Sequence, residues 1–83
     1  MMNDVHEPLI FAYSLPLNKQ LRLKRLYDNF SQTELAALIG CGTSTISGIE
    51  RGHVRIPYKY LDKVKAYIFE QQYENKKLVQ YLD

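Results

Sequence analysis

Residues 32 to 51 combine apolar positions, a small residue and a glycine in a pattern that two short crossing helices satisfy. Such helices can share one core only through a few apolar side chains. Ala36 falls where the second helix passes too close for a larger residue, and Gly40 falls where the turn calls for a positive φ that is cheap only for glycine. The apolar positions are Leu35, Ile39, Cys41, Ile46 and Ile49. The pattern predicts a helix, a tight turn and a second helix.

Both predicted helices have recognisable ends. Ser31 and Glu34 have the spacing of a capping box, in which each side chain accepts a hydrogen bond from the backbone amide of the other residue. The first helix then stops at Gly40. The second is expected from Thr43 to residue 51 and ends before Gly52, a residue suited to a left-handed helix cap.

The rest of the chain predicts further helices and one strand. Large apolar residues alternate with smaller ones over residues 9–15, between two prolines, which is typical of a short strand. A helix capped by Asn18 is expected up to about Asn29. Another is expected to start at Pro57 and to run towards Leu82, or to break near Tyr73. The expected fold is therefore all-α with a candidate short N-terminal β-strand.

Composition places the chain among single-domain proteins without a disulfide. It has 83 residues and one cysteine, Cys41, which fits a reducing compartment. Residues 17–60 carry seven positive and three negative side chains, a local excess of four that suits a partner with phosphate groups. The N-terminus carries Asp4 and Glu7 where a signal peptide would be positive, so a cytoplasmic protein is expected. No catalytic, cofactor or metal-binding constellation is visible, so neither enzymatic activity nor a cofactor is expected.

The segments FSQTELAALIG and CGTSTISGIERG, preceded by LRLKRL and followed by HVRIPYKYLDKV, identify a family resemblance. Together they resemble the Cro/phage-repressor type of helix-turn-helix domain, also called XRE-like, over about residues 19–70. The resemblance implies a five-helix lambda-repressor-like DNA-binding domain. It also implies that the third helix reads double-stranded DNA, with a symmetric dimer on a two-fold operator. The expected division is an N-terminal extension (1–17), this domain (18–72) and a C-terminal helix or tail (73–83).

The resemblance also implies roles for individual residues. Arg25 and Glu50 match a pair that forms a structural salt bridge in relatives. The positions expected to face base edges are Thr43, Ser44, Ser47 and Gly48. The positions expected near DNA phosphates are Gln32, Thr45, Arg51, His53 and Arg55.

The base-facing set departs from the family pattern. Relatives commonly carry long polar side chains there, whose bidentate bonds to bases discriminate by about 1–3 kcal/mol each. Here the side chains are short hydroxyls, and Gly48 has none, at a cost of about 1 kcal/mol relative to alanine in a helix. We therefore expect Gly48 to let the helix lie closer to DNA, and specificity to depend on DNA shape, water and half-site spacing.

Two places are candidates for pairing with a second copy. In the last helix, residues 61 to 82 follow an a/d pattern with Asn75 in the seam. Its first half is expected to belong to the domain's own core, which leaves Leu78, Val79 and Leu82 for a partner. The N-terminal strand is the second candidate. The leading prediction is a homodimeric transcriptional repressor of phage, prophage, plasmid or bacterial origin. Two alternatives stay open: an antitoxin that binds a toxin and represses its own operon, and a protein-interaction module that has lost DNA binding.

Overall fold

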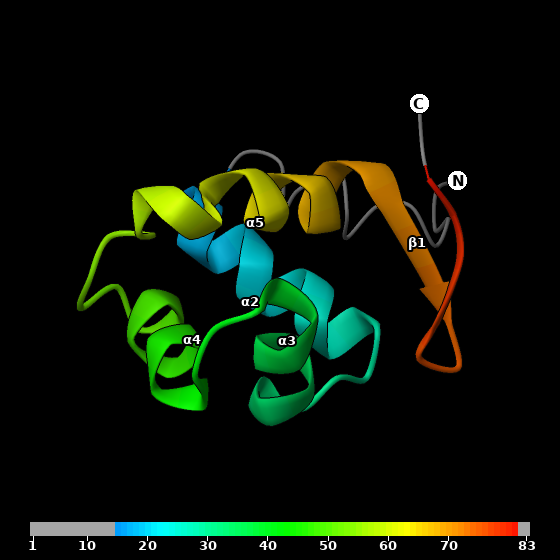
Figure 1. The fold of residues 1–83 in the computed structure, drawn as a ribbon, viewed down its shortest axis with the longest axis horizontal. Coiled ribbons are helices and arrows are strands. Elements are labelled where there is room, and N and C mark those ends of the chain that lie inside the picture. The colour runs from blue at the N-terminus through cyan, green and yellow to red at the C-terminus, as the bar shows by residue number, and fades with distance from the viewer. Residues whose placement is uncertain (1–14, 82–83) are drawn as a thin grey trace, which may run out of the picture.

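The computed structural model describes residues 15–81, so the predicted strand at residues 9–15 lies almost entirely outside the described part of the chain. The described residues form four helices followed by an antiparallel hairpin. In Figure 1, α5 lies along one side of the other three helices, and the hairpin descends from its end. The elements are α2 (Leu17–Tyr27), α3 (Gln32–Ile39), α4 (Thr43–Glu50), α5 (Tyr58–Glu70), β1 (Gln71–Glu74) and β2 (Lys77–Tyr81).

The limits of α3 and α4 follow from local chemistry, as predicted. The Glu34 amide donates to Ser31 Oγ at 3.0 Å, and the Ser31 amide donates to Glu34 Oε1 at 2.8 Å, which completes the capping box. Gly40 ends α3 with a φ of 89°, in the left-handed region. Beyond α4, Gly52 has a φ of 77° and turns the chain into the loop before α5.

The helix α2 differs from the prediction at its start. It begins at Leu17, and the residue at its N-cap is Pro16, whose side chain makes no capping hydrogen bond. Asn18 therefore lies inside the first turn and does not cap the helix. The helix ends at Tyr27 with Asp28 as its C-cap, after which Asn29 takes a φ of 63°, a conformation that asparagine tolerates better than most residues.

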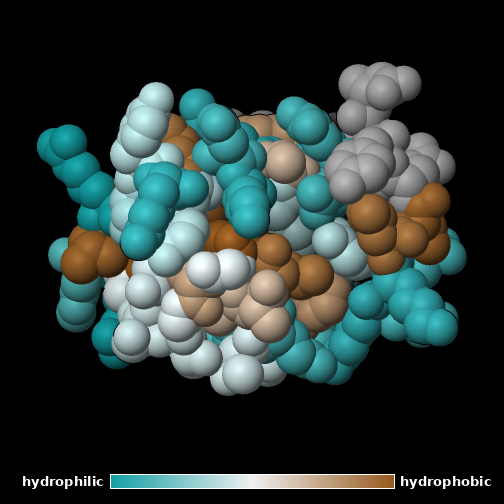
Figure 2. All heavy atoms as spheres, in the orientation of Figure 1, coloured by the Kyte–Doolittle hydropathy of each residue, from teal (hydrophilic) through white to brown (hydrophobic). Residues whose placement is uncertain are grey.

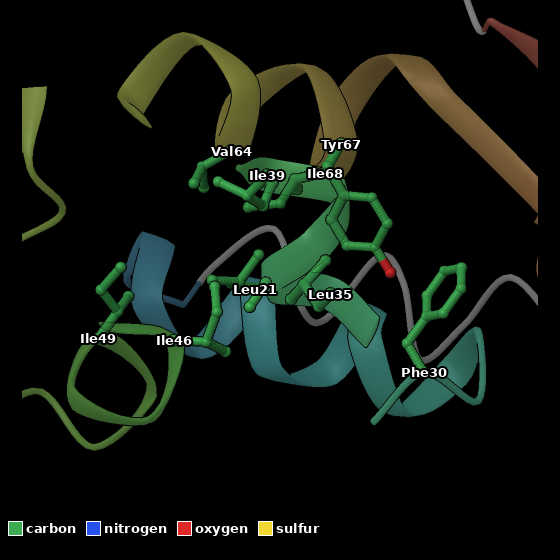
Figure 3. Packing of buried hydrophobic residues seen from close by; sticks show 10 residues of the cluster. Leu21, Phe30, Leu35, Ile39, Ile46, Ile49, Val64, Tyr67 and Ile68 are labelled. Carbon is green, nitrogen blue, oxygen red and sulfur yellow. The ribbon is translucent and has the colours of Figure 1, made fainter. Parts of the chain in front are cut away.

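One hydrophobic core joins all four helices. Figure 3 shows side chains of α2, α3 and α4 converging on the side of α5 that carries Val64 and Tyr67. Cys41 packs against this cluster from the turn between α3 and α4. The completely or almost completely buried members include Leu21, Leu35, Ile39, Ile46, Ile49, Val64 and Tyr67. The apolar positions that defined the sequence pattern therefore meet in the core.

The end of the chain corrects the prediction of an all-α fold. The domain is mostly helical, but α5 stops at Glu70, and Gln71 has the extended backbone of a strand (φ −120°, ψ 141°). Residues 71–81 form the hairpin instead of a continued helix, with an irregular register between Gln72 and Tyr73. Asn75 lies in the hairpin turn, so the helical a/d seam predicted through it is wrong.

An aromatic cluster explains why the helix gives way to the hairpin. The Tyr73 ring lies 5.2 Å from the Phe30 ring in an edge-to-face arrangement and 5.8 Å from the Tyr67 ring, measured between centroids. Such contacts between rings stabilise the fold in addition to the free energy gained by burying the rings. An extended β1 carries Tyr73 back onto the end of α2 and the start of α3, so a tertiary contact determines the local conformation.

Candidate nucleic-acid interface

The first turns of α3 and α4 lie at one edge of the molecule. In Figure 1 both helices start at the lower edge and rise from it. A hydrogen bond from Thr43 Oγ1 to Thr33 Oγ1, at 3.2 Å, joins the start of α4 to the first turn of α3. Backbone N–H groups at helix starts carry partial positive charge, so this edge is suited to an anionic partner.

The outer face of α4 carries hydroxyl groups. Thr43 and Ser44 are exposed, and Ser47 is half-buried. On the opposite face Ile46 and Ile49 are buried in the core, with 0% and 1% of their surface exposed. Figure 2 shows this part of the surface as a pale zone of intermediate hydropathy along the lower edge. Three of the four residues predicted to face bases are thus on the side of α4 that a ligand can approach.

The fourth, Gly48, is covered by the protein's own loop. Gly48 is buried, and a Cβ atom added there would lie 3.3 Å from Val54 Cγ2 in the loop after α4. The His53 amide also donates to the Gly48 carbonyl at 3.0 Å, which holds this loop across the helix. The missing side chain makes room for the protein's own loop, which gives Gly48 a role in packing within the domain in addition to its predicted place on the base-facing side.

A buried ion pair joins α4 to α2. Arg25 Nε donates to Glu50 Oε2 at 2.7 Å, and its Nη2 donates to Oε1 at 2.9 Å, so the two groups bind in a bidentate arrangement. A third donor, Nη1, reaches the Phe30 carbonyl at 2.9 Å. The hydrogen bonds with Glu50 raise the pKa of Arg25 above its ordinary value. The structure therefore pairs the two residues that the family resemblance implied, and the pair fixes the end of α4 relative to α2.

Gln32 joins the same network. Its Nε2 donates to Glu50 Oε1 at 3.1 Å, so one of its two amide hydrogens is used inside the protein. The side chain is half-buried at the first residue of α3. Its predicted partner was a phosphate, and the second hydrogen can still serve one. Thr45, also predicted to lie near phosphate, is half-buried on α4.

The loop between α4 and α5 carries the other predicted phosphate contacts. Arg51, His53 and Arg55 are all exposed there. The loop lies at the far left of Figure 1, beyond the last turn of α4. It also lines a shallow groove with Leu17 and Asn18 at the start of α2. These two arginines and one histidine therefore flank the hydroxyl face on one side.

Two residues of this edge were missed by sequence reasoning. Thr33 is exposed and bonds to Thr43, and its position in the first turn of a capped helix was a usable signal. Lys76, in the hairpin turn, lies 3.1 Å and 3.0 Å from the two carboxylate oxygens of Glu34. No sequence signal links residues this far apart. The pKa of Glu34 is lowered below its ordinary value, mainly by the hydrogen bond from the Ser31 amide and next by the hydrogen bond from Lys76.

Other chemistry has little support in this part of the chain. Cys41 is half-buried, and its burial raises the pKa of the thiol, which disfavours a reactive thiolate. Within residues 15–81, no group of three or more histidine, cysteine or acidic residues could hold a metal ion. No helix among the same residues has the length and apolar character needed to cross a membrane.

Comparison with known families gives one match. The family model HTH_3, described as helix-turn-helix, matches residues 19–66, which is more than half of the chain. The matched region runs from α2 into α5 and leaves the hairpin outside. Comparisons with curated proteins and with solved structures found no match.

Proposed function

This chain belongs to the HTH_3 family of helix-turn-helix domains (Cro/C1-type, XRE family), as its sequence predicted, and we propose a function on that premise. The chain is proposed to be a sequence-specific regulator of transcription that acts as a homodimeric repressor. The family is a non-enzymatic DNA-binding family with a lambda-repressor-like fold. The observation that supports the proposal best is the outer face of α4. Its hydroxyl groups face outward, while the buried Arg25–Glu50 pair holds the helix in position behind them.

In the proposed complex, α4 enters the major groove, which is wide enough to admit an α-helix. Thr43, Ser44 and Ser47 then face base edges. A hydroxyl group both donates and accepts, so each can bond to several bases and discriminates weakly by itself. Sequence preference in this proposal comes mainly from DNA shape, bridging water and the spacing of two half-sites.

The backbone contacts in the proposed complex surround this face. Gln32 donates its second Nε2 hydrogen to a phosphate beside the first turn of α3, while its first remains on Glu50. On the other side, Arg51, His53 and Arg55 follow the sugar-phosphate backbone, with Thr45 as a further hydroxyl donor. Such contacts set the register of the protein on the duplex without reading sequence.

Dimerisation is proposed because one half-site offers few discriminating contacts. Two copies of α4 about one DNA turn apart double the base contacts and make half-site spacing part of the recognition. Occupancy of an operator that overlaps a promoter then represses transcription. In the antitoxin alternative, the same surface binds DNA and another part of the chain binds a toxin.

Selection of bound duplexes from a random DNA pool tests the proposal. We expect a two-fold symmetric consensus that is bound more tightly than a scrambled duplex. Replacement of Thr43, Ser44 and Ser47 by alanine is expected to lower that preference, because the direct and water-bridged contacts of the hydroxyl groups are lost while DNA shape and half-site spacing still contribute. Gln72→Ala, a matched polar-to-alanine change at an exposed strand position, is expected to leave it intact.

Several outcomes would decide between the functions. Absence of any enriched sequence, together with no binding to duplex DNA at low salt, would reject DNA recognition and favour a protein-interaction module. Retention of the preference by the triple alanine variant would remove α4 as the reading element. Purification of the chain in a stable complex with the product of a neighbouring gene would support the antitoxin alternative over a self-sufficient regulator.

A further inference from the structure

The turn of the C-terminal hairpin lies at the proposed DNA-binding edge. Figure 1 shows the turn between β1 and β2 pointing towards the lower edge, where α3 and α4 begin. Lys76 in this turn contacts both carboxylate oxygens of Glu34, at 3.0 and 3.1 Å. The hairpin lies outside the region that matches the HTH_3 family, so the family gives it no role.

The contact of Lys76 with α3 lies next in sequence to the contact that joins α3 to α4. Lys76 binds Glu34, and Glu34 caps the first turn of α3 through the Ser31 amide. The neighbouring residue, Thr33, accepts the hydrogen bond from Thr43, the first residue of α4. Lys76 therefore lies beside the first turn of α3, on the side away from α4 and from the loop with Arg51, His53 and Arg55.

The backbone of the turn is unusual for a lysine. Asn75 and Lys76 have φ angles of 50° and 66°, so both central residues of the turn are left-handed. A two-residue hairpin turn of this kind strongly favours glycine at its second central position, because glycine has no Cβ to clash there. Lysine at position 76 therefore has a conformational cost that glycine would not have. A residue held at such a cost is a candidate for a functional role, and the contact with Glu34 indicates that the role involves the charge of Lys76.

The charges at this edge indicate what that role is. The carboxylate of Glu34 is needed to cap α3, but it also places negative charge beside the proposed phosphate contacts of that helix. Lys76 offsets this charge, and its ammonium, which has three hydrogens, lies within hydrogen-bond distance of both carboxylate oxygens. Its side chain remains 47% exposed, so a further acceptor such as a phosphate can approach the ammonium from solvent.

We propose that the hairpin turn is part of the DNA-binding surface, where Lys76 offsets the charge of Glu34 and donates a hydrogen bond to a backbone phosphate beside the first turn of α3. This inference rests on the proposed function. The protein then holds the DNA backbone from two sides of the hydroxyl face, with the α4–α5 loop on one side and the hairpin on the other. Figure 2 shows hydrophilic residues gathered over the hairpin turn.

The test measures binding to the selected duplex and to a scrambled duplex over a range of salt concentrations. Lys76→Gln removes one positive charge from each subunit, so for the proposed dimer the slope of log affinity against log salt is expected to fall by about 1.8, which is about 0.9 per subunit. That change corresponds to about sixtyfold weaker binding of the dimer at 0.1 M salt, which is about eightfold per subunit, equal on both duplexes. Lys76→Gly should weaken binding by the same factor while keeping or raising the melting temperature, because it relieves the left-handed backbone.

Two control variants make the result specific. Lys65→Gln removes the same charge from the exposed side of α5, away from the proposed interface, and should leave the slope unchanged because distant surface charges are screened. Lys76→Arg keeps the charge and should keep the slope. Equal slopes for Lys76→Gln, Lys65→Gln and the unchanged protein would overturn the inference while leaving the proposed function intact. Loss of DNA binding by the unchanged protein itself would reject the proposed function instead.

Discussion

The buried pair of Arg25 and Glu50 allows the most direct test of how this domain is held together. We consider Arg25→Met, which keeps much of the side-chain volume and removes the guanidinium. The carboxylate of Glu50 has 2% of its side-chain surface exposed. After the substitution only Gln32 still donates to it, and the Phe30 carbonyl loses its side-chain donor.

The expected loss of stability is large for a chain of this size. Removing one partner of a buried ion pair costs about 3–5 kcal/mol, because the remaining charge stays buried without compensation. A domain of 83 residues has a free energy of unfolding of about 4–12 kcal/mol in all. At about 4 °C or more per kcal/mol, the melting temperature should fall by at least about 12 °C.

A double-mutant cycle separates the lost attraction from the unpaired charge. Replacing Glu50 by leucine in the Arg25→Met variant removes the second charge, so at least about 2 kcal/mol of the loss should return. Urea unfolding followed by circular dichroism measures all four proteins. A cost below about 1 kcal/mol for Arg25→Met would be the value of an exposed surface pair and would refute the reasoning.

Three further predictions concern single positions of the interface. Gln32→Ala should cost about 1 kcal/mol of stability by removing the hydrogen bond to Glu50, and should weaken DNA binding as well; urea unfolding and fluorescence anisotropy measure the two effects, and unchanged binding would exclude Gln32 from the interface. Gly48→Ala should stabilise the fold by up to about 1 kcal/mol, since Val54 lies in an exposed loop that can move aside, and DNA affinity should not change; a loss of affinity with intact stability would place Gly48 on the reading face. Because the pKa of Glu34 is lowered, its contribution to the free energy of unfolding is complete above the ordinary glutamate pKa and is lost as pH falls through the lowered pKa. Glu34→Gln should flatten the dependence of the free energy of unfolding on acidic pH, and an identical dependence in the variant would contradict the assignment.

The helix-turn-helix was predictable because its determinants are local. The capping residues Ser31 and Glu34 lie three positions apart, and Gly40 is needed by the backbone of the turn itself. The apolar residues of α3 and α4 recur at the helical period, so each helix shows its buried face in its own sequence. The same stretch also carries the hydroxyl face, since residues that alternate with the buried ones must face outward.

The hairpin was not predictable in the same way. The residues from 71 to 82 fit a helical a/d pattern, and the Asn75-Lys76 turn lacks the glycine that usually marks a hairpin. What decides the conformation is the packing of Tyr73 on Tyr67 and on Phe30, and Phe30 lies far from both tyrosines in the sequence. The gain exists only once the helices have assembled, so local pattern carries no sign of it.

Sequence alone thus determined the family, the two short helices and the turn between them, because those features depend on residues within one or two helical turns. Only the tertiary structure decided which neighbours complete the interface. In the folded domain the loop residue Val54 lies against Gly48, and Lys76 in the hairpin turn contacts Glu34 on α3. Both contacts join segments whose approach depends on how the helices pack, and side-chain spacing along the chain holds no information about that distance.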